Sequence, residues 1–301
     1  EYEGLAEKLA DPAWAPDFGK PELNARSGAT VIGVRRFLIA YNVNLNSDQR
    51  ADARDLALSL RERGRFARDA QGQKVEDGQG GFQRVPGILP SCKAVGWVIP
   101  EYQRAQVSMN LTDYRVTGMH QAFEATEKLA REKGLRVTGS EIVGVVPLEA
   151  ILDSGHHFLE KRGASRGVPA HQVIRCAIQS LGLADVAPFD PMERILELRL
   201  ARQGLVAMDL DAFSAELSTE SPAPGGGSVS ALAGALSASL ASMVANLTHG
   251  KSRRDEERSR MEQVAMEAQK LREDLLSAVD RDTEAFNRVM DAYRMPRTTD
   301  A

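Results

Sequence analysis

The sequence has little cysteine, few aromatic residues and no excess of basic charge. Only two cysteines occur among 301 residues, and Cys92 and Cys176 form no CxxC pair. The sequence therefore predicts neither a disulfide framework nor a zinc cluster, and it fits a reducing cytoplasm. The 38 Lys and Arg residues against 42 Asp and Glu give a net charge of −4, which excludes a general nucleic-acid-binding protein because a phosphate backbone selects a basic surface. A hydrophobic fraction of 43% and this length are typical of a globular protein with roughly two domains.

No charged and apolar segment opens the given sequence, and none of its runs is a typical membrane span. Because the chain starts at Glu1 without a charged and apolar leader, we expect a fragment truncated at both ends. The longest run without charge, residues 229–247, contains four serines, a glycine and many alanines. A lipid-facing helix favours larger apolar side chains, so this run predicts a tightly packed, buried helix and no membrane partner.

Strand and helix patterns alternate through the first two thirds of the chain. Strands are predicted at residues 31–45, 94–99, 104–111 and 137–146, and amphipathic helices at 47–64 and 117–134. This β-α-β-β-α-β order is typical of the ferredoxin-like fold, an antiparallel sheet with both helices on one side. The Gly-rich, polar residues 65–87 are predicted to form a surface insertion.

The composition changes near residues 204–210, after which strand-like residues disappear. A PGGGS turn at Pro224–Ser228 precedes the small-residue helix, and a polar turn then leads into a long helix with one apolar stripe. We expect the first helices of an all-α domain here. The predicted fold class of the whole chain is therefore α+β, a ferredoxin-like subdomain followed by these helices.

Five segments resemble the formimidoyltransferase-cyclodeaminase family. They are WAPDFG at 14–19, FLIAYNVNL at 37–45, GWVIPEYQRAQVSMNLTDY at 96–114, APFDPMERILE at 187–197 and SPAPGGGSVSALAGALSASLASMVANLT at 221–248. The resemblance covers nearly the whole chain, in the family's own domain order. It implies that residues 1–24 are the end of the formiminotransferase N-terminal subdomain and a folate-site connector, 25–203 the C-terminal subdomain, 204–211 a linker, and 212–301 the N-terminal part of the cyclodeaminase domain.

The resemblance implies a bifunctional enzyme of histidine degradation. Such an enzyme moves a formimino group from N-formiminoglutamate to tetrahydrofolate, its co-substrate, and then closes the product to 5,10-methenyltetrahydrofolate with release of ammonia. We expect a cytoplasmic homo-oligomer that uses no metal and binds no nucleic acid. Two alternatives stay open, namely a methenyltetrahydrofolate cyclohydrolase and a non-catalytic module for folate binding or oligomerisation.

The connector segment is the folate-binding candidate that the resemblance implies. Its residues are Trp14, Ala15, Pro16, Asp17, Phe18, Gly19, Lys20 and Pro21. An aromatic ring can stack on a pterin while Asp17 or a backbone group binds the amino edge. The alternative interpretation is a proline-stiffened connector in which Trp14 and Phe18 are buried.

Two aspartates are the catalytic candidates, because VDRDTEAF at 279–286 resembles the family segment that holds an active-site aspartate. Asp282 follows Leu275 and Val279 on the apolar row of the predicted helix, whereas Asp280 lies off that row. We therefore expect Asp282 to be buried, which would favour the protonated acid that donates to departing ammonia. Asp280 is the second candidate.

Other polar residues carry weaker hypotheses. The family's catalytic histidine belongs to a subdomain that precedes this segment, and it matches none of His120, His156, His157, His171 and His249. The neighbours His156 and His157 lack the i, i+4 spacing of a helical metal pair. Arg35 and Arg36, inside the predicted first strand, would bind a ligand carboxylate or form an internal salt bridge. The polar face of Gln106, Ser108 and Asn110 would line a folate groove or face water.

Overall fold

The computed structural model describes residues 4–200 and 204–295. The ends of the expected domains at residues 1, 203 and 301 lie outside the described residues. The chain divides into two units, residues 1–36 and 37–301. The first unit contains a short helix, α1 (Leu5–Lys8), and a 3₁₀ turn, η1 (Pro12–Trp14), which begins where the Asp11 carboxylate accepts a hydrogen bond from the Ala13 amide at 2.9 Å.

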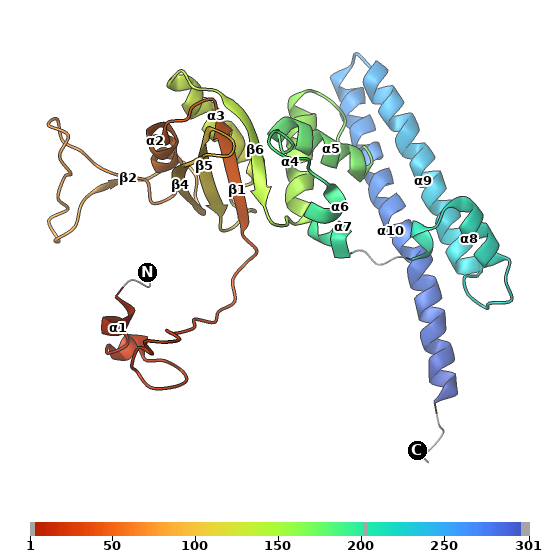
Figure 1. Ribbon diagram of the computed structural model, residues 1–301. Helices are drawn as coiled ribbons and strands as arrows, with labels where there is room; N and C mark the ends of the chain where they lie inside the picture. The colour runs from red at the N-terminus through yellow and green to blue at the C-terminus, as the bar shows by residue number, and fades with distance from the viewer. Residues whose placement is uncertain (1–3, 201–203, 296–301) are drawn as a thin grey trace. The chain divides into compact units, whose positions relative to one another are not determined.

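A four-stranded antiparallel sheet forms the first part of the second unit (Figure 1). Its strands are β1 (Ile39–Leu45), β4 (Cys92–Ile99), β5 (Arg104–Leu111) and β6 (Val137–Val143), in the order β4-β5-β1-β6. The helices α2 (Arg50–Leu60) and α3 (Met119–Glu132) connect β1 to β4 and β5 to β6. The predicted ferredoxin-like arrangement is confirmed.

The first strand is shorter than predicted. It begins at Ile39, and the preceding residues from Val31 have no strand partner among the described residues. Arg35 and Arg36 are therefore exposed residues outside the sheet, so their predicted place in a buried strand is wrong. A run of apolar residues on both faces occurs in buried strands and also in extended connectors. The pattern alone therefore does not distinguish a strand from a connector.

The main core lies between one face of the sheet and the two connecting helices. Ile39, Tyr41, Val43 and Leu45 of β1 are fully buried there. From α2, the predicted stripe of Ala53, Leu56, Ala57 and Leu60 packs into the same cluster. This alternation in the strand and the 3.6-residue period in the helix place the apolar side chains together.

The predicted surface insertion is confirmed as an exposed hairpin. It is closed by the short strands β2 (Arg65–Phe66) and β3 (Arg84–Val85). The rings of Phe66 and Phe82 meet edge to face, with centroids 5.7 Å apart. At its base, Arg65 forms an ion pair with Asp55 of α2 at 2.8 Å, so the hairpin combines local aromatic contacts with a polar attachment to α2.

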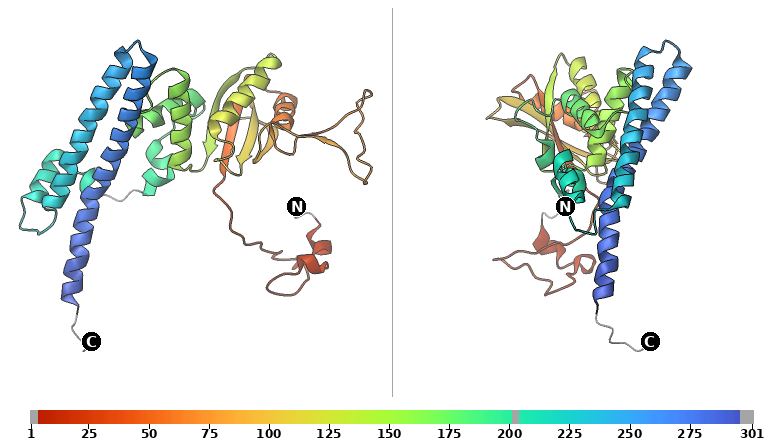
Figure 2. Two further views of the ribbon diagram at one scale, coloured as in Figure 1. Left: turned by 180° about the vertical axis from the view of Figure 1, so that it is seen from behind. Right: turned by 90° about the vertical axis from the view of Figure 1, so that its right-hand side faces the viewer.

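Helices make up the rest of the chain. They are α4 (Leu148–Lys161), α5 (Ala170–Leu181), α6 (Pro191–Arg194), α7 (Leu196–Leu200), η2 (Leu205–Ala207), α8 (Leu210–Leu217), α9 (Gly226–Lys251) and α10 (Asp255–Arg294). The last two form a helical hairpin (Figure 2). With 40 residues against 26, α10 continues beyond the first residue of α9.

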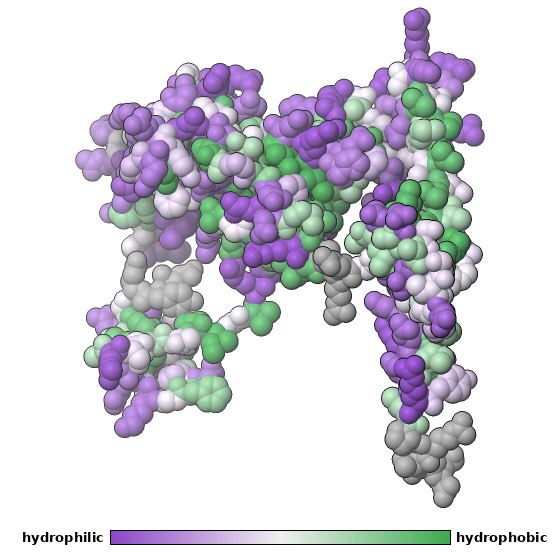
Figure 3. All heavy atoms as spheres, turned by 45° about the vertical axis from the view of Figure 1, so that its right-hand side comes forward, coloured by the Kyte–Doolittle hydropathy of each residue, from purple (hydrophilic) through white to green (hydrophobic). Residues whose placement is uncertain are grey.

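The small-residue helix α9 is not tightly buried, which contradicts the expectation from its composition. By length and composition it could cross a membrane, and only 22% of its most apolar window is buried. Leu236, Leu240 and Val244 are each more than half exposed, and hydrophobic side chains follow the surface of the hairpin (Figure 3). Its buried side, which includes Ala235 and Ser242, packs on α10 and the α4–α5 connection.

A stacked histidine pair predicts acid sensitivity. The rings of His120 and His157 lie 4.5 Å apart, beside Glu124 and Lys161, and burial is the main cause that lowers the pKa of His120 to about 4. Because the unfolded chain binds this proton at a higher pH than the folded chain does, stability should fall as the pH drops from about 6.5 towards 4. In thermal melts, His120→Gln should flatten this pH dependence, and exposed His171→Gln should leave it unchanged. An unchanged slope in His120→Gln would contradict this account.

Candidate functional site

The predicted PGGGS turn and the predicted aspartates meet at the first turn of α9. The helix begins at Gly226, and its N-cap residue, Gly225, has no side chain that could accept hydrogen bonds from the amides of the first turn. Asp282, on α10, accepts a hydrogen bond from the Ser228 amide at 2.9 Å through Oδ2. A carboxylate at this end of a helix also interacts favourably with the helix dipole. Two motifs 54 residues apart in sequence therefore form one site.

Gly227 is required by the close approach of the two helices. A Cβ atom placed on Gly227 would lie 2.2 Å from Oδ1 of Asp282 and 2.5 Å from Oδ2. No side chain fits there unless the carboxylate moves. Because glycine has no Cβ atom, the Asp282 carboxylate can approach the start of α9. This is a physical reason for a glycine at this position of the turn.

The two candidate aspartates have different surroundings. Oδ1 of Asp280 accepts a hydrogen bond from the Leu205 amide at 2.7 Å, and its carboxylate lies against Gly204. Asp280 therefore anchors the beginning of η2 on α10. Asp282 instead faces the glycine turn, so the geometry favours Asp282 for chemistry and Asp280 for attachment of the linker.

The expected burial of Asp282 is wrong, because the residue is exposed. Val279, one turn earlier, is 1% exposed, but Phe286 and Val289, further along the same row, are 37% and 52% exposed. This part of α10 extends beyond the start of α9 (Figure 1). An apolar row predicts burial only where a second element covers it, and α9 ends its cover at the Ser228 contact, so that Phe286 and Val289 stay exposed.

The predicted folate-binding segment lies in the first unit around a hollow of about 610 Å³. The structure brings five of the eight predicted residues to its lining, namely Trp14, Ala15, Pro16, Asp17 and Phe18. Gly19, Lys20 and Pro21 are exposed and are not among its lining residues. Within this unit Trp14 is 41% exposed and Phe18 is 95% exposed.

Trp14→Ala is expected to weaken folate binding more than it lowers stability. A stacked aromatic contributes about 0.5–1.5 kcal/mol beyond its buried area, which corresponds to roughly a 2- to 13-fold rise in Kd. The Lys8 ammonium lies 4.8 Å from the centre of the Trp14 ring, and this exposed contact contributes little to stability. Folate titration and thermal melts of the full-length protein test this expectation. A large loss of melting temperature with normal affinity would instead favour a connector role.

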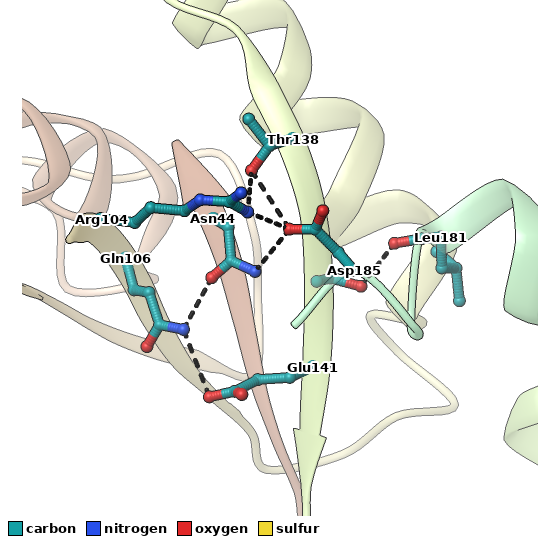
Figure 4. Close-up of polar contacts among 8 residues, drawn as sticks. Asn44, Arg104, Gln106, Thr138, Glu141, Leu181 and Asp185 are labelled. Carbon is teal, nitrogen blue, oxygen red and sulfur yellow. Dashed lines mark hydrogen bonds and ion pairs between the residues drawn. The ribbon is translucent and has the colours of Figure 1, made fainter. Parts of the chain in front are cut away.

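A buried polar network lies on the face of the sheet opposite the main core (Figure 4), and the sequence predicted only part of it. Gln106 is fully buried, and its Nε2 donates to Oδ1 of Asn44 at 2.6 Å. Its Oε1 accepts a hydrogen bond from Trp97 at 2.9 Å. The interpretation that Gln106 faces water is therefore wrong, whereas Asn110, at the end of the same strand, is exposed. In the sequence, the polar residues at alternate positions of β5 were the signal that indicated this polar face.

The same network includes an ion pair between Arg104 and Asp185, which the sequence pattern did not predict. Arg104 forms an ion pair with Asp185, and its Nη1 also donates to Oγ1 of Thr138 at 3.1 Å. Asp185 comes from the segment after α5, so a long-range contact joins the sheet to the helices. Sequence spacing carries no signal for such a pair.

A cavity of about 760 Å³ lies where α4 and α9 end. Arg162, Arg175 and Arg258 line it, and Nη2 of Arg258 donates to the Gly163 carbonyl at 2.8 Å. Cations near helix carboxyl ends offset the partial negative charge there. The predicted catalytic and folate-binding residues do not line this cavity. In the described part of the chain, no group of three or more His, Cys, Asp or Glu side chains is arranged to bind a metal.

Comparison with known proteins identifies the family. The family model for the formiminotransferase domain matches residues 40–201, and that for formiminotransferase-cyclodeaminase matches residues 209–301. The chain belongs to the formiminotransferase-cyclodeaminase family. The two matches meet near the predicted composition change, and the second one contains both the glycine turn and Asp282.

Individual relatives agree with this assignment. The chain is 40% identical to formimidoyltransferase-cyclodeaminase of Mus musculus and 41% identical to that of Dictyostelium discoideum, over 99% of its own length and 53% of theirs. It is also 41% identical to methenyltetrahydrofolate cyclohydrolase of Methylorubrum extorquens over 30% of its length and 44% of that protein. The chain spans about half the length of the formimidoyltransferase-cyclodeaminases it matches.

Proposed function

We propose that the protein is a bifunctional folate enzyme. It transfers the formimino group of N-formiminoglutamate to tetrahydrofolate and then cyclises the product to 5,10-methenyltetrahydrofolate with release of ammonia. Support comes from two matched domains in the order found in the relatives. For the second step, the observation that carries the proposal is the contact of Asp282 with the glycine turn at Ser228.

Cyclisation needs one group that both accepts and donates a proton. The second folate nitrogen attacks the formimino carbon, a new carbon–nitrogen bond forms, and the bond to the departing nitrogen breaks. The departing nitrogen gains the proton lost by the attacking nitrogen and one more from solvent, which balances neutral ammonia and a methenyl cation. A carboxylate beside the carbon can take the first proton and pass it on.

We propose that Asp282 acts first as a proton acceptor and then as a proton donor, because the residue is exposed. In this exposed rather than enclosed position, Asp282 would act first as the base that deprotonates the attacking nitrogen. It would then carry the proton that departing ammonia requires. This sequence replaces the buried, already protonated acid expected from the helical pattern, and it uses the same residue.

For the transferase step, we propose that tetrahydrofolate binds at the hollow around Trp14 and Asp17. The ring of Trp14 offers a stacking surface, and the Asp17 carboxylate can accept hydrogen bonds from an amino edge. The proposed setting is the cytoplasm, within histidine degradation, without a metal and without nucleic-acid or membrane partners. The exposed apolar side chains of α9 require a covering surface, and we propose a homo-oligomer, in which a second subunit or the rest of the domain would supply it.

A methenyltetrahydrofolate cyclohydrolase is the second candidate. The 41% identity to such an enzyme over 91 residues favours it. The formiminotransferase match over residues 40–201 and the hollow around Trp14 favour the bifunctional enzyme. A non-catalytic module for folate binding or oligomerisation would not need a carboxylate at the glycine turn.

One assay separates these candidates. The full-length protein is incubated with N-formiminoglutamate and tetrahydrofolate, and ammonia and the methenyl product are measured together over time. The proposed enzyme releases ammonia and methenyltetrahydrofolate in equal amounts. A protein that only hydrolyses added methenyltetrahydrofolate, or one that binds folate without turnover, would contradict the proposal.

A further inference from the structure

Ser228 is the residue through which α9 holds the Asp282 carboxylate. Its side chain is completely buried, and its amide donates to Oδ2 of Asp282 at 2.9 Å. Its hydroxyl oxygen lies 2.8 Å from the Val279 carbonyl oxygen, 3.2 Å from Oδ2 of Asp282 and 3.2 Å from Oγ1 of Thr283. A small, buried hydroxyl therefore has three oxygen neighbours on α10.

A hydroxyl group has one hydrogen to donate and can rotate to choose its acceptor. Here the Val279 carbonyl at 2.8 Å and the Asp282 carboxylate at 3.2 Å compete as acceptors, while the Thr283 hydroxyl at 3.2 Å can either accept or donate. The ionised carboxylate is the stronger acceptor. When Asp282 takes up a proton, Oδ2 becomes a weaker acceptor and the hydroxyl can turn back to Val279. The buried serine is thus hydrogen-bonded in both protonation states.

We propose that Ser228 is a positioning residue for Asp282 in the cyclisation, an inference that rests on the proposed function. Asp282 changes its charge twice in each cycle of that reaction. A rotating hydroxyl at Oδ2 keeps the carboxyl group in place through both changes. With Oδ2 held by Ser228, Oδ1 is the oxygen left to exchange protons with the substrate. Gly227 supplies the space for this geometry, and Ser228 supplies the attachment.

The test compares serines of the same helix in the full-length protein. Ser228→Ala removes the rotating hydroxyl, and Ser228→Thr restores one. The matched control is Ser242→Ala, because Ser242 is also buried on α9, at 1% exposure, and donates to the Gly167 carbonyl at 3.1 Å. Measured quantities are kcat and KM for ammonia release, the rate of formimino transfer, and the melting temperature.

Ser228→Ala should lower kcat for ammonia release roughly 10- to 100-fold, the range for a hydrogen bond to a charged group. KM and formimino transfer should stay within about twofold, because neither ligand binding nor the first site uses this hydroxyl. Ser228→Thr should recover most of kcat, and Ser242→Ala should keep it. If Ser228→Ala does not fold, Ser228→Cys, with a weak donor of similar size, should show the same loss of kcat.

Two results would overturn the proposal. One is a wild-type kcat in Ser228→Ala, and the other is an equal loss in Ser228→Ala and Ser242→Ala, which would indicate a general effect on folding. Asp282→Asn, measured in parallel, separates this outcome from failure of the proposed function. If Asp282→Asn is inactive while Ser228→Ala is normal, only the role of Ser228 is wrong. If the wild-type protein releases no ammonia, the function and the role of Ser228 fall together.

Discussion

Asp282→Asn should stop ammonia release by the full-length protein while formimino transfer continues. An amide cannot take the proton of the attacking nitrogen, and general acid–base groups contribute roughly 10²- to 10⁴-fold in rate. The change keeps the size of the side chain and leaves an oxygen that can accept from the Ser228 amide, so the fold should remain. Single-turnover ammonia release and the melting temperature are the measurements.

Asp280→Asn is the matched control, two residues away on the same helix. Its carboxylate accepts from the Leu205 amide at 2.7 Å, a contact that attaches η2 and that an asparagine oxygen can largely replace. Ammonia release should therefore stay within about threefold of the wild-type rate, since a surface hydrogen bond of this kind contributes about 0.5–1.5 kcal/mol to stability and none to proton transfer. Near-normal release from Asp282→Asn with a collapse in Asp280→Asn would transfer the catalytic role to Asp280.

Gln106→Leu should cause the largest loss of stability among the polar substitutions in the sheet. Leucine fills the space but leaves the Asn44 carbonyl and the Trp97 indole without their partners at 2.6 and 2.9 Å. An unsatisfied buried group costs about 1–3 kcal/mol, and of the two partners Asn44 is fully buried whereas Trp97 is 41% exposed, so the free energy of unfolding should fall by about 1–3 kcal/mol. Urea denaturation at constant pH measures this loss.

The same strand supplies the control for that prediction. Asn110 points to the same face of β5 but is exposed, and Asn110→Leu should change the free energy of unfolding by less than about 0.5 kcal/mol. Equal losses at the two positions would mean that hydrophobic substitution on this face, rather than the buried network, sets the stability.

The order of strands and helices was predictable because each element carries its own periodic pattern. The stripe of α2 from Ala53 to Leu60 and the alternation of β5 both predict the buried faces that the structure shows. The start of β1 was not predictable, since apolar residues from Val31 onward suit a strand and an extended connector equally. What distinguishes the two is a neighbouring strand, which the local sequence does not specify.

The site was predictable in its residues and not in its geometry. The resemblance pointed to Trp14 through Pro21 and to the two aspartates, and the helical period chose Asp282. Burial of Asp282 was predicted wrongly because the period identifies a face but not how far the covering helix extends. The roles of Gly227 and Ser228 follow from the packing of α9 on α10, a contact between residues 54 positions apart.

A crystal structure of the full-length protein with 5,10-methenyltetrahydrofolate tests the central claim most directly. The account predicts the methenyl carbon at the first turn of α9, with a carboxylate oxygen of Asp282 close to it and the other oxygen still bonded to Ser228. Folate bound away from this turn, with Asp282 open to solvent as in the unbound chain, would contradict the account.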